Sequence, residues 1–194
     1  WRFAFYGSSN AMITDSTIGE AFSTGSSVIR LTRSSVNYAS SQSSATLWAY
    51  DSSINLLSAG SSSTSWLLNT TYNTLNIQHA ARVYVGWYLD VHVVDAIDQD
   101  VPSANLTITY SNTTTADSKL TDDNGWVRFA LMEKMINATA QYPVGNYTVE
   151  ATYLTHSNAT TANMTANKQI ELAFEDFVIP EFAHFLILPL FMIS

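Results

Sequence analysis

Residues 13–18 read Ile-Thr-Asp-Ser-Thr-Ile, and the same pattern returns three times in the first half of the chain. The copies are 31–36 (Leu-Thr-Arg-Ser-Ser-Val), 49–54 (Ala-Tyr-Asp-Ser-Ser-Ile) and 67–72 (Leu-Leu-Asn-Thr-Thr-Tyr). The copies follow one another at a constant interval, and the two positions before the last residue of each are always Ser or Thr. The position after each copy holds Gly once and Asn three times: Gly19, Asn37, Asn55 and Asn73. A repeat of fixed length predicts stacked copies of one structural unit.

A β-solenoid accounts for every feature of this repeat. Its coils stack about 4.8 Å apart, so equivalent side chains form ladders along the stack. Asn side chains can hydrogen-bond along such a ladder, and Ser or Thr fits the tight corners. We therefore predict short β-solenoid coils with an 18-residue period over residues 1–82, with their handedness left open. The alternative is a Ser/Thr-rich meander whose spacing is coincidental.

The repeat resembles the terminal coils of archaeal surface proteins with right-handed parallel β-helix repeats, although its period is short for such a coil. The resemblance implies a surface that binds polysaccharide or, in some members, cleaves it with clustered acids and a base. Asp15 and Asp51 lie two coils apart with Arg33 between them, an arrangement similar to that of a lyase groove. Ordinary turn positions explain the same residues, and we favour that interpretation.

The second half alternates apolar and polar residues over several short segments, which is typical of half-buried strands. Turn sequences such as 121–125 (Thr-Asp-Asp-Asn-Gly) separate them, and no helical periodicity is present. The expected strands are 83–95, 104–110, 126–131, 147–153 and 169–174. We predict an all-β chain in which residues 83–175 form a β-sandwich.

Four segments of this half resemble the carboxypeptidase-regulatory-like branch of immunoglobulin-like domains, over about residues 87–175. They are 91–95 (Val-His-Val-Val-Asp), 101–104 (Val-Pro-Ser-Ala), 121–125 and 145–149 (Gly-Asn-Tyr-Thr-Val). The resemblance implies an immunoglobulin-like fold and a non-catalytic spacer or adhesion module. The junction at 84–91 also looks like the segment that joins a β-helix to such a domain in archaeal envelope proteins.

The composition limits the classes of function. The chain has 46% apolar residues, only 12% charged residues and a net charge of −8, whereas an average domain is about 25% charged. The charge is uneven, because residues 1–86 carry a net +1 and residues 87–194 a net −9. An acidic surface repels phosphate backbones, so we expect no nucleic-acid partner. The lack of cysteine excludes disulfides, thiolate metal sites and a cysteine nucleophile.

Two acidic clusters are candidate Ca²⁺ sites, because oxygen-rich loops at the end of a sandwich can hold this ion. We favour the alternative that these residues form turns through their own side chains, and therefore expect no resident cofactor. The four histidines show no zinc-ligand spacing, and no catalytic constellation is evident, so we predict a non-enzyme. The clusters are Asp95, Asp98 and Asp100, then Asp122 and Asp123; the histidines are His79, His92, His156 and His184.

Acceptor sequons for N-glycosylation are dense, and six of the seven lie between residues 105 and 163. Glycans there would hydrate a surface with few charges and block pairing at strand edges. The sequons therefore favour a glycoprotein, and the absence of cysteine favours an archaeal envelope over an animal secretory pathway. The asparagines are Asn69, Asn105, Asn112, Asn137, Asn146, Asn158 and Asn163.

The C-terminal residues 176–194 are strongly apolar and resemble archaeal C-terminal anchor segments, in which an Ile-Pro-Glu-Phe-like motif precedes a membrane helix. Only thirteen residues follow from Phe182 onward, fewer than the ~20 of a spanning helix. Two hypotheses remain: a truncated membrane anchor, or a donor strand that inserts into a neighbouring subunit. A start at Trp1 also leads us to expect a piece of a longer gene product.

We therefore predict a non-enzymatic, extracellular structural glycoprotein of the archaeal cell surface, a self-assembling subunit of an envelope polymer such as a filament, sheath or surface layer. Its expected partners are further copies of itself and covalent N-glycans. The alternative is a membrane-anchored adhesin or polysaccharide-binding protein whose upstream β-helix is missing. A polysaccharide lyase or hydrolase is the third class, and it requires a carboxylate pair and a base in one groove.

Overall fold

The computed structural model describes residues 1–179, and every regular element in that range is a β-strand. Most of the predicted tail, from Pro180 onward, lies outside the described residues. Residues 1–179 contain no helix of the length and apolarity that crossing a membrane requires. The strands of the first half are β1 (Arg2–Phe5), β2 (Asn10–Thr14), β3 (Thr17–Ser23), β4 (Val28–Thr32), β5 (Ser35–Ser41), β6 (Thr46–Tyr50), β7 (Ser53–Ala59), β8 (Thr64–Leu68) and β9 (Thr71–Ile77). The remaining strands are β10 (Arg82–Asp95), β11 (Asn105–Tyr110), β12 (Thr115–Leu120), β13 (Trp126–Ile136), β14 (Gln141–Pro143), β15 (Asn146–Tyr153), β16 (His156–Asn163) and β17 (Lys168–Phe174).

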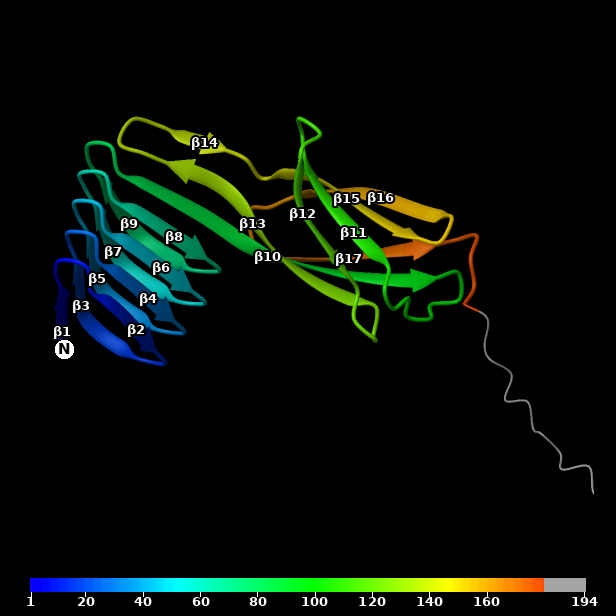
Figure 1. Ribbon diagram of the computed structural model, residues 1–194, viewed down its shortest axis with the longest axis horizontal. Helices are drawn as coiled ribbons and strands as arrows, with labels where there is room; N and C mark the ends of the chain where they lie inside the picture. Colours follow the sequence, from blue (N-terminus) through cyan, green and yellow to red (C-terminus); the bar gives the residue numbers. More distant parts are fainter. Residues whose placement is uncertain (180–194) are drawn as a thin grey trace, which may run out of the picture.

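The first half is a stack of solenoid-like coils, as predicted, with two strands in each coil (Figure 1). Strands β1, β3, β5, β7 and β9 pair in parallel in a first sheet, and β2, β4, β6, β8 and the start of β10 do so in a second. Paired residues of neighbouring coils are one repeat apart, as in Ile18 with Val36 and Val36 with Ile54. The period found in the sequence is therefore the length of one coil.

A narrow apolar core runs through the coils between the two sheets. The residue that ends each repeated segment points into it, and Ile18, Val36 and Ile54 are all at most 4% exposed. The second sheet contributes Ile29, Leu47 and other alternate residues to the same core. This position of the repeat is apolar in every coil because each coil buries its side chain against the next.

One long strand, β10, joins the two halves (Figure 1). Its first residues, Arg82 to Gly86, pair in parallel with β8 as the next rung of the coils. Its later residues, Leu89 to Asp95, pair in parallel with β17. The antiparallel strand β13 pairs with β10 along both parts, with a bulge between Val85 and Gly86. One sheet therefore runs without interruption from the coils into the second half.

In the second half, two sheets enclose a second apolar core. One consists of β17, the later part of β10, and β13; the other has the strand order β12, β11, β15, β16. Leu89, Phe129, Leu106 and Val149 come from the two sheets and are all fully buried in this core. The five strands expected here are present. Strands β12, β14 and β16 were not foreseen, because their exposed and partly polar residues give no clear alternation.

Candidate functional site

The residues considered for a lyase groove form one corner of the coils. Asp15, Arg33, Asp51 and Asn69 occupy equivalent positions in successive coils, and each adopts a positive φ between 46° and 51°. Asp and Asn tolerate this left-handed conformation better than most residues. We call this column the aspartate corner. It turns the chain between the two sheets, which matches the turn interpretation of these residues.

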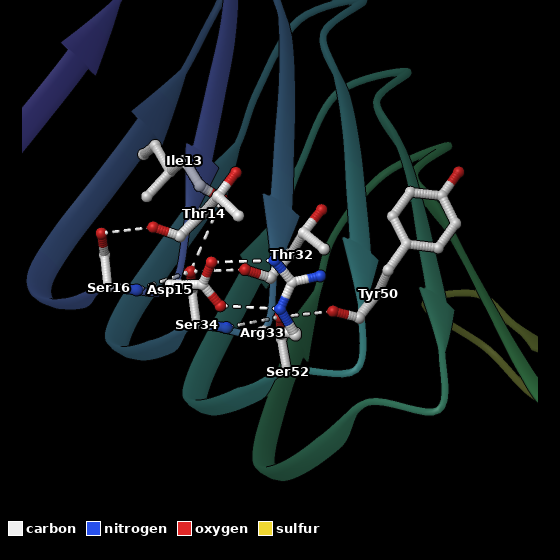
Figure 2. A network of polar contacts seen from close by, with 9 residues as sticks. All are labelled: Ile13, Thr14, Asp15, Ser16, Thr32, Arg33, Ser34, Tyr50 and Ser52. Atoms are coloured by element: carbon white, nitrogen blue, oxygen red, sulfur yellow. Dashed lines mark hydrogen bonds and ion pairs between the residues drawn. The ribbon is translucent and has the colours of Figure 1, made fainter.

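Side chains of neighbouring coils pair along the aspartate corner (Figure 2). The Arg33 guanidinium donates two hydrogen bonds to the Asp15 carboxylate, at 2.7 and 2.8 Å. These hydrogen bonds hold the pKa of the exposed Asp15 carboxyl below its ordinary value. The Asn69 amide donates to Asp51 Oδ1 at 2.7 Å, and Asn167 in the second half donates to Asn69 Oδ1 at 2.8 Å. Both carboxylates are thus used in contacts between coils.

A buried hydroxyl ladder runs beside the aspartate corner. The Oγ atoms of Ser34 and Ser52 and the Oγ1 of Thr70 each accept a backbone N–H from the preceding coil, at 3.1 to 3.3 Å. Each hydroxyl donates in turn to the carbonyl two residues before it, for example Ser52 to Tyr50 at 2.7 Å. Figure 2 shows the first part of this network. The first hydroxyl of each pair in the repeat therefore satisfies backbone groups at a corner where sheet pairing is interrupted.

The predicted asparagine ladder is also present, on the exposed face of the first sheet. The Asn55 amide donates to Asn37 Oδ1 at 3.0 Å, and the Asn73 amide donates to Asn55 Oδ1 at the same distance. Amide groups can extend such a chain indefinitely, because each donates on one side and accepts on the other.

The opposite corner shows a second column of positive φ that was not predicted. Gly7, Gly25, Ser43, Ser61 and His79 occupy it, again one in each successive coil. His79 is thus an exposed corner residue. The mixture of residue types hid the pattern, although the constant spacing was a usable signal.

Aromatic side chains form a third column, on the outer face of the second sheet. Trp48 stacks on Trp66 with ring centroids 5.2 Å apart and an interplanar angle of 8°. Trp66 stacks on Tyr84 at 4.1 Å and 14°. Tyr50 lies beside Trp48 with the two ring planes within 3° of parallel. Trp48, Trp66 and Tyr84 also recur with the period of the coil, so the parallel stack places them next to one another.

This column forms one wall of a cleft between the coils and the second half, with a volume of about 320 Å³. We call it the aromatic cleft. Its other wall comes from β11, β12 and β15, and residues of β10 and β13 lie at its floor. The 18-residue spacing of Trp48, Trp66 and Tyr84 was a usable signal for one wall, but no sequence signal joined the two walls, because they lie far apart in the chain. Its lining includes Trp48, Tyr50, Trp66, Leu68, Tyr84, Gly86, Tyr110, Asp117, Met132 and Tyr147.

Gly86 and Tyr147 hold the cleft in shape. A Cβ at Gly86 would lie 2.7 Å from the backbone oxygen of Leu131, so no larger residue fits between β10 and β13. The Tyr147 hydroxyl donates to the Met132 carbonyl at 2.8 Å and ties β15 to β13. Burial raises the pKa of Tyr147 to about 12, so this hydroxyl remains protonated at neutral pH.

The seven sequon asparagines differ in what their side chains do. Asn69 and Asn158 use their amide groups as donors within the protein, to Asp51 and to the Ala173 carbonyl. In Asn112 and Asn137 the side-chain oxygen instead accepts from the backbone N–H and the hydroxyl of the sequon threonine, and within residues 1–179 the amide nitrogen bonds to no other protein group. Asn105, Asn146 and Asn163 are exposed on strands.

The acidic loops use their carboxylates locally. Asp95 is 1% exposed and accepts backbone N–H groups from Ile97, Gln99 and Ile179, each at 2.8 to 2.9 Å. Asp122 accepts the N–H groups of Asn124 and Trp126. Residues 1–179 contain no group of three or more His, Asp or Glu side chains arranged to hold a metal ion. The calcium hypothesis thus gains no support from these loops.

Two of the histidines lie near carboxylates. His92 Nε2 is 2.8 Å from Asp100, its Nδ1 is 3.2 Å from Glu171, and its ring stacks on Trp126. His156 lies 3.1 Å from Asp176. His184 lies outside the described residues.

No protein-family model matches this chain, and no curated protein matches it. Among solved structures, the Bacillus anthracis TIE protein aligns with a TM-score of 0.37 and 19% sequence identity. The alignment covers 53% of this chain and 19% of that chain. A likeness this weak carries no argument, so function is inferred from the geometry described above.

Proposed function

We propose that this chain is a non-enzymatic structural subunit of an extracellular polymer that grows by stacking coils. The observation that carries the proposal is that backbone pairs, hydroxyls and asparagine amides link successive coils through repeated contacts, so a further coil can join by the same contacts. Among residues 1–179, no strand pairs with the outer sides of β1 and β2, and a coil from a second copy, or from residues ahead of Trp1 in a longer chain, can pair there. Unpaired strand edges are templates for pairing with another chain, and proteins that remain monomeric usually protect them.

The hydroxyl ladder continues this argument at the level of single atoms. Ser34, Ser52 and Thr70 each accept a backbone N–H from the coil before. Within residues 1–179, the equivalent hydroxyl of Ser16 accepts none. A further coil, from a second copy or from preceding residues of a longer chain, would present such an N–H to this hydroxyl.

Exposed apolar side chains gather on the first coil. Trp1, Phe3, Tyr6 and Met12 are 38% to 92% exposed and make up four of the nine large apolar residues exposed in the described part of the chain. Apolar surface of this kind is typical of protein interfaces. A further coil stacked here would cover this surface, and we propose that a second copy supplies that coil in the polymer.

The remaining features of the proposal come from the sequence. Two facing sheets in the second half suit an immunoglobulin-like sandwich that serves as a spacer between assembly sites. The dense sequons favour a glycoprotein on the cell surface, and the resemblance of the coils and tail favours an archaeal source. On this proposal the second half carries the acidic charge and the glycans outward, while the coils make the subunit contacts.

Electron microscopy of native material, combined with light scattering of the purified protein, tests the proposal. We expect ordered assemblies from the wild-type chain and monomers from Phe3→Lys and Met12→Lys, because a charge on an edge strand opposes pairing. Ile97→Lys is the matched control, since Ile97 is 57% exposed and lies far from the first coil. A wild-type chain that stays monomeric at all concentrations would contradict the proposal. Assembly by both edge variants at wild-type levels would contradict it as well.

A further inference from the structure

The aromatic cleft contains hydrogen-bonding atoms that the protein itself does not use. Within residues 1–179, the indole N–H groups of Trp48 and Trp66 and the hydroxyls of Tyr50 and Tyr110 bond to no other protein group, although all four line the cleft. Aromatic residues with such polar atoms are favoured where one part of a ligand is apolar and another is polar. The cleft therefore offers apolar ring edges and several free donors together.

The charge of the cleft is balanced. Asp117 supplies the single carboxylate among the lining residues, and the Lys119 ammonium lies 3.3 Å from its Oδ2. Its Oδ1 accepts the Ser118 N–H at 2.8 Å. Because the Lys119 ammonium compensates the charge of the Asp117 carboxylate, the lining residues do not favour a strongly charged ligand. A neutral ligand with hydroxyl groups can still bond to the carboxylate.

We propose that the aromatic cleft binds a neutral oligosaccharide. The faces of the stacked rings are turned toward one another, so their aligned edges line the cleft. A pyranose ring has apolar C–H faces, which can lie across the edges of Trp48, Tyr50 and Trp66, and hydroxyls around its rim. Those hydroxyls meet the free indole and phenol groups and the Asp117 carboxylate. The volume of about 320 Å³ is near the lower end of small-ligand pockets, roughly 300–1,000 Å³, and accommodates about one or two sugar rings.

Both walls of the site are fixed before a ligand arrives. The stacked rings hold one another in place at 4.1 to 5.2 Å, and the Tyr147 hydroxyl fixes the opposite wall to Met132. The continuous strand β10 links the wall on the coils to the wall on the second half. A site prepared in this way loses little conformational entropy on binding.

Tryptophan fluorescence and calorimetric titration with a panel of neutral oligosaccharides test this inference. The panel contains cellotetraose, maltotetraose, mannotetraose and chitotetraose, with a sialylated and a sulfated tetrasaccharide as charged comparisons. We expect at least one neutral oligosaccharide to bind. Trp48→Ala should weaken that binding roughly tenfold or more, because it removes the Trp48 ring edge and its indole N–H from the cleft. Asp117→Asn should weaken it several-fold while leaving the thermal unfolding temperature near that of the wild type.

Tyr142→Ala is the control, because Tyr142 is 45% exposed on β14 and does not line the cleft. Circular dichroism of each variant separates loss of binding from loss of fold, and Asp117→Asn serves if Trp48→Ala does not fold. Binding of only the charged sugars, or of none, would overturn the inference. Binding unchanged in both cleft variants would overturn it equally. Polymer assembly plays no part in this test, so either proposal can fail without the other.

Discussion

At the residue scale, the same residue type has different roles according to its position in the coil. The asparagines of the exposed ladder bond to each other, whereas Asn69 turns a corner in a left-handed conformation and bonds to Asp51. The aspartates show the same division, since Asp15 pairs with Arg33 and Asp95 binds backbone N–H groups. Composition alone does not distinguish these roles, because each depends on which groups the fold brings near.

Glycan occupancy should follow the side-chain geometry of the sequons. We expect Asn112 and Asn137 to be modified more fully than Asn69 and Asn158, whose amide nitrogens already donate within the protein. Glycopeptide mass spectrometry of native material measures this directly. Higher occupancy at Asn69 and Asn158 than at the other pair would contradict the expectation.

The Asp95 carboxylate should make stability depend on pH. Burial alone would raise its pKa, but the three backbone N–H groups together hold it below the ordinary 3.8. A lowered pKa in the folded state stabilises the fold above about pH 3.8, and this contribution is lost as pH falls through the folded pKa. We expect Asp95→Asn to lower the free energy of unfolding at pH 7 by about 1–3 kcal/mol.

Chemical denaturation at pH 7 and pH 3 measures this effect, and the difference between wild type and Asp95→Asn should shrink at the lower pH. Asp98→Asn is the control, because Asp98 is exposed and Asn tolerates its φ of 61°. An equal difference at both pH values would show that the carboxylate charge is not the cause.

At the element scale, neighbouring coils are held together by a small set of recurring contacts. Backbone pairing joins the strands, and hydroxyl, amide and aromatic ladders join the corners and faces. These contacts are local to adjacent coils, so the stability of the stack depends on each interface between neighbours. Weakening a single rung should therefore affect the coils on both of its sides.

Ser52→Ala tests the hydroxyl ladder. The Ser52 Oγ accepts the Ser34 N–H at 3.1 Å and donates to the Tyr50 carbonyl at 2.7 Å. Its removal leaves a buried N–H without a partner, so we expect a loss of about 1–3 kcal/mol in the free energy of unfolding. The neighbouring Ser53→Ala is the control, since Ser53 is exposed and its hydroxyl bonds only to Ser35. Thermal denaturation of both variants compares them, and equal losses would exclude the ladder as the cause.

At the scale of the whole molecule, the two halves are built onto one strand. On the edge of β10 that faces away from β13, β8 pairs with the first part and β17 with the second. Trp87, in the middle of β10, packs against both cores and donates from Nε1 to Glu133 at 2.7 Å. The predicted domain boundary between residues 82 and 83 thus lies at the start of β10, a strand that belongs to both halves. We expect the halves to unfold together.

Gly86→Ala tests this coupling. The added methyl group would meet the Leu131 backbone oxygen at 2.7 Å and push β13 away from β10 at their bulge. Overpacking of this kind costs roughly 1–3 kcal/mol of the free energy of unfolding. Because both halves share β10, we expect a single unfolding transition at a lower temperature than that of the wild type. Gly60→Ala is the control, because the three atoms nearest to a Cβ there all belong to the end of the Gln42 side chain, which can move. Calorimetry that shows separate transitions for the two halves would contradict the expected coupling.

The repeat in the amino-acid sequence was enough to predict the all-β class, the coil length and the asparagine and hydroxyl ladders. These features recur at a constant spacing, and in a parallel stack that spacing alone brings equivalent residues into contact. The aromatic column of Trp48, Trp66 and Tyr84 carried the same signal and was overlooked.

Two features became visible only in the folded chain: β10 belongs to both halves, and Tyr110, Asp117 and Tyr147 face the aromatic column across a cleft. The strands that bring these residues together pair over long and unequal separations in the sequence. Such contacts leave no period to read, because they depend on how two packed cores fit against one shared sheet.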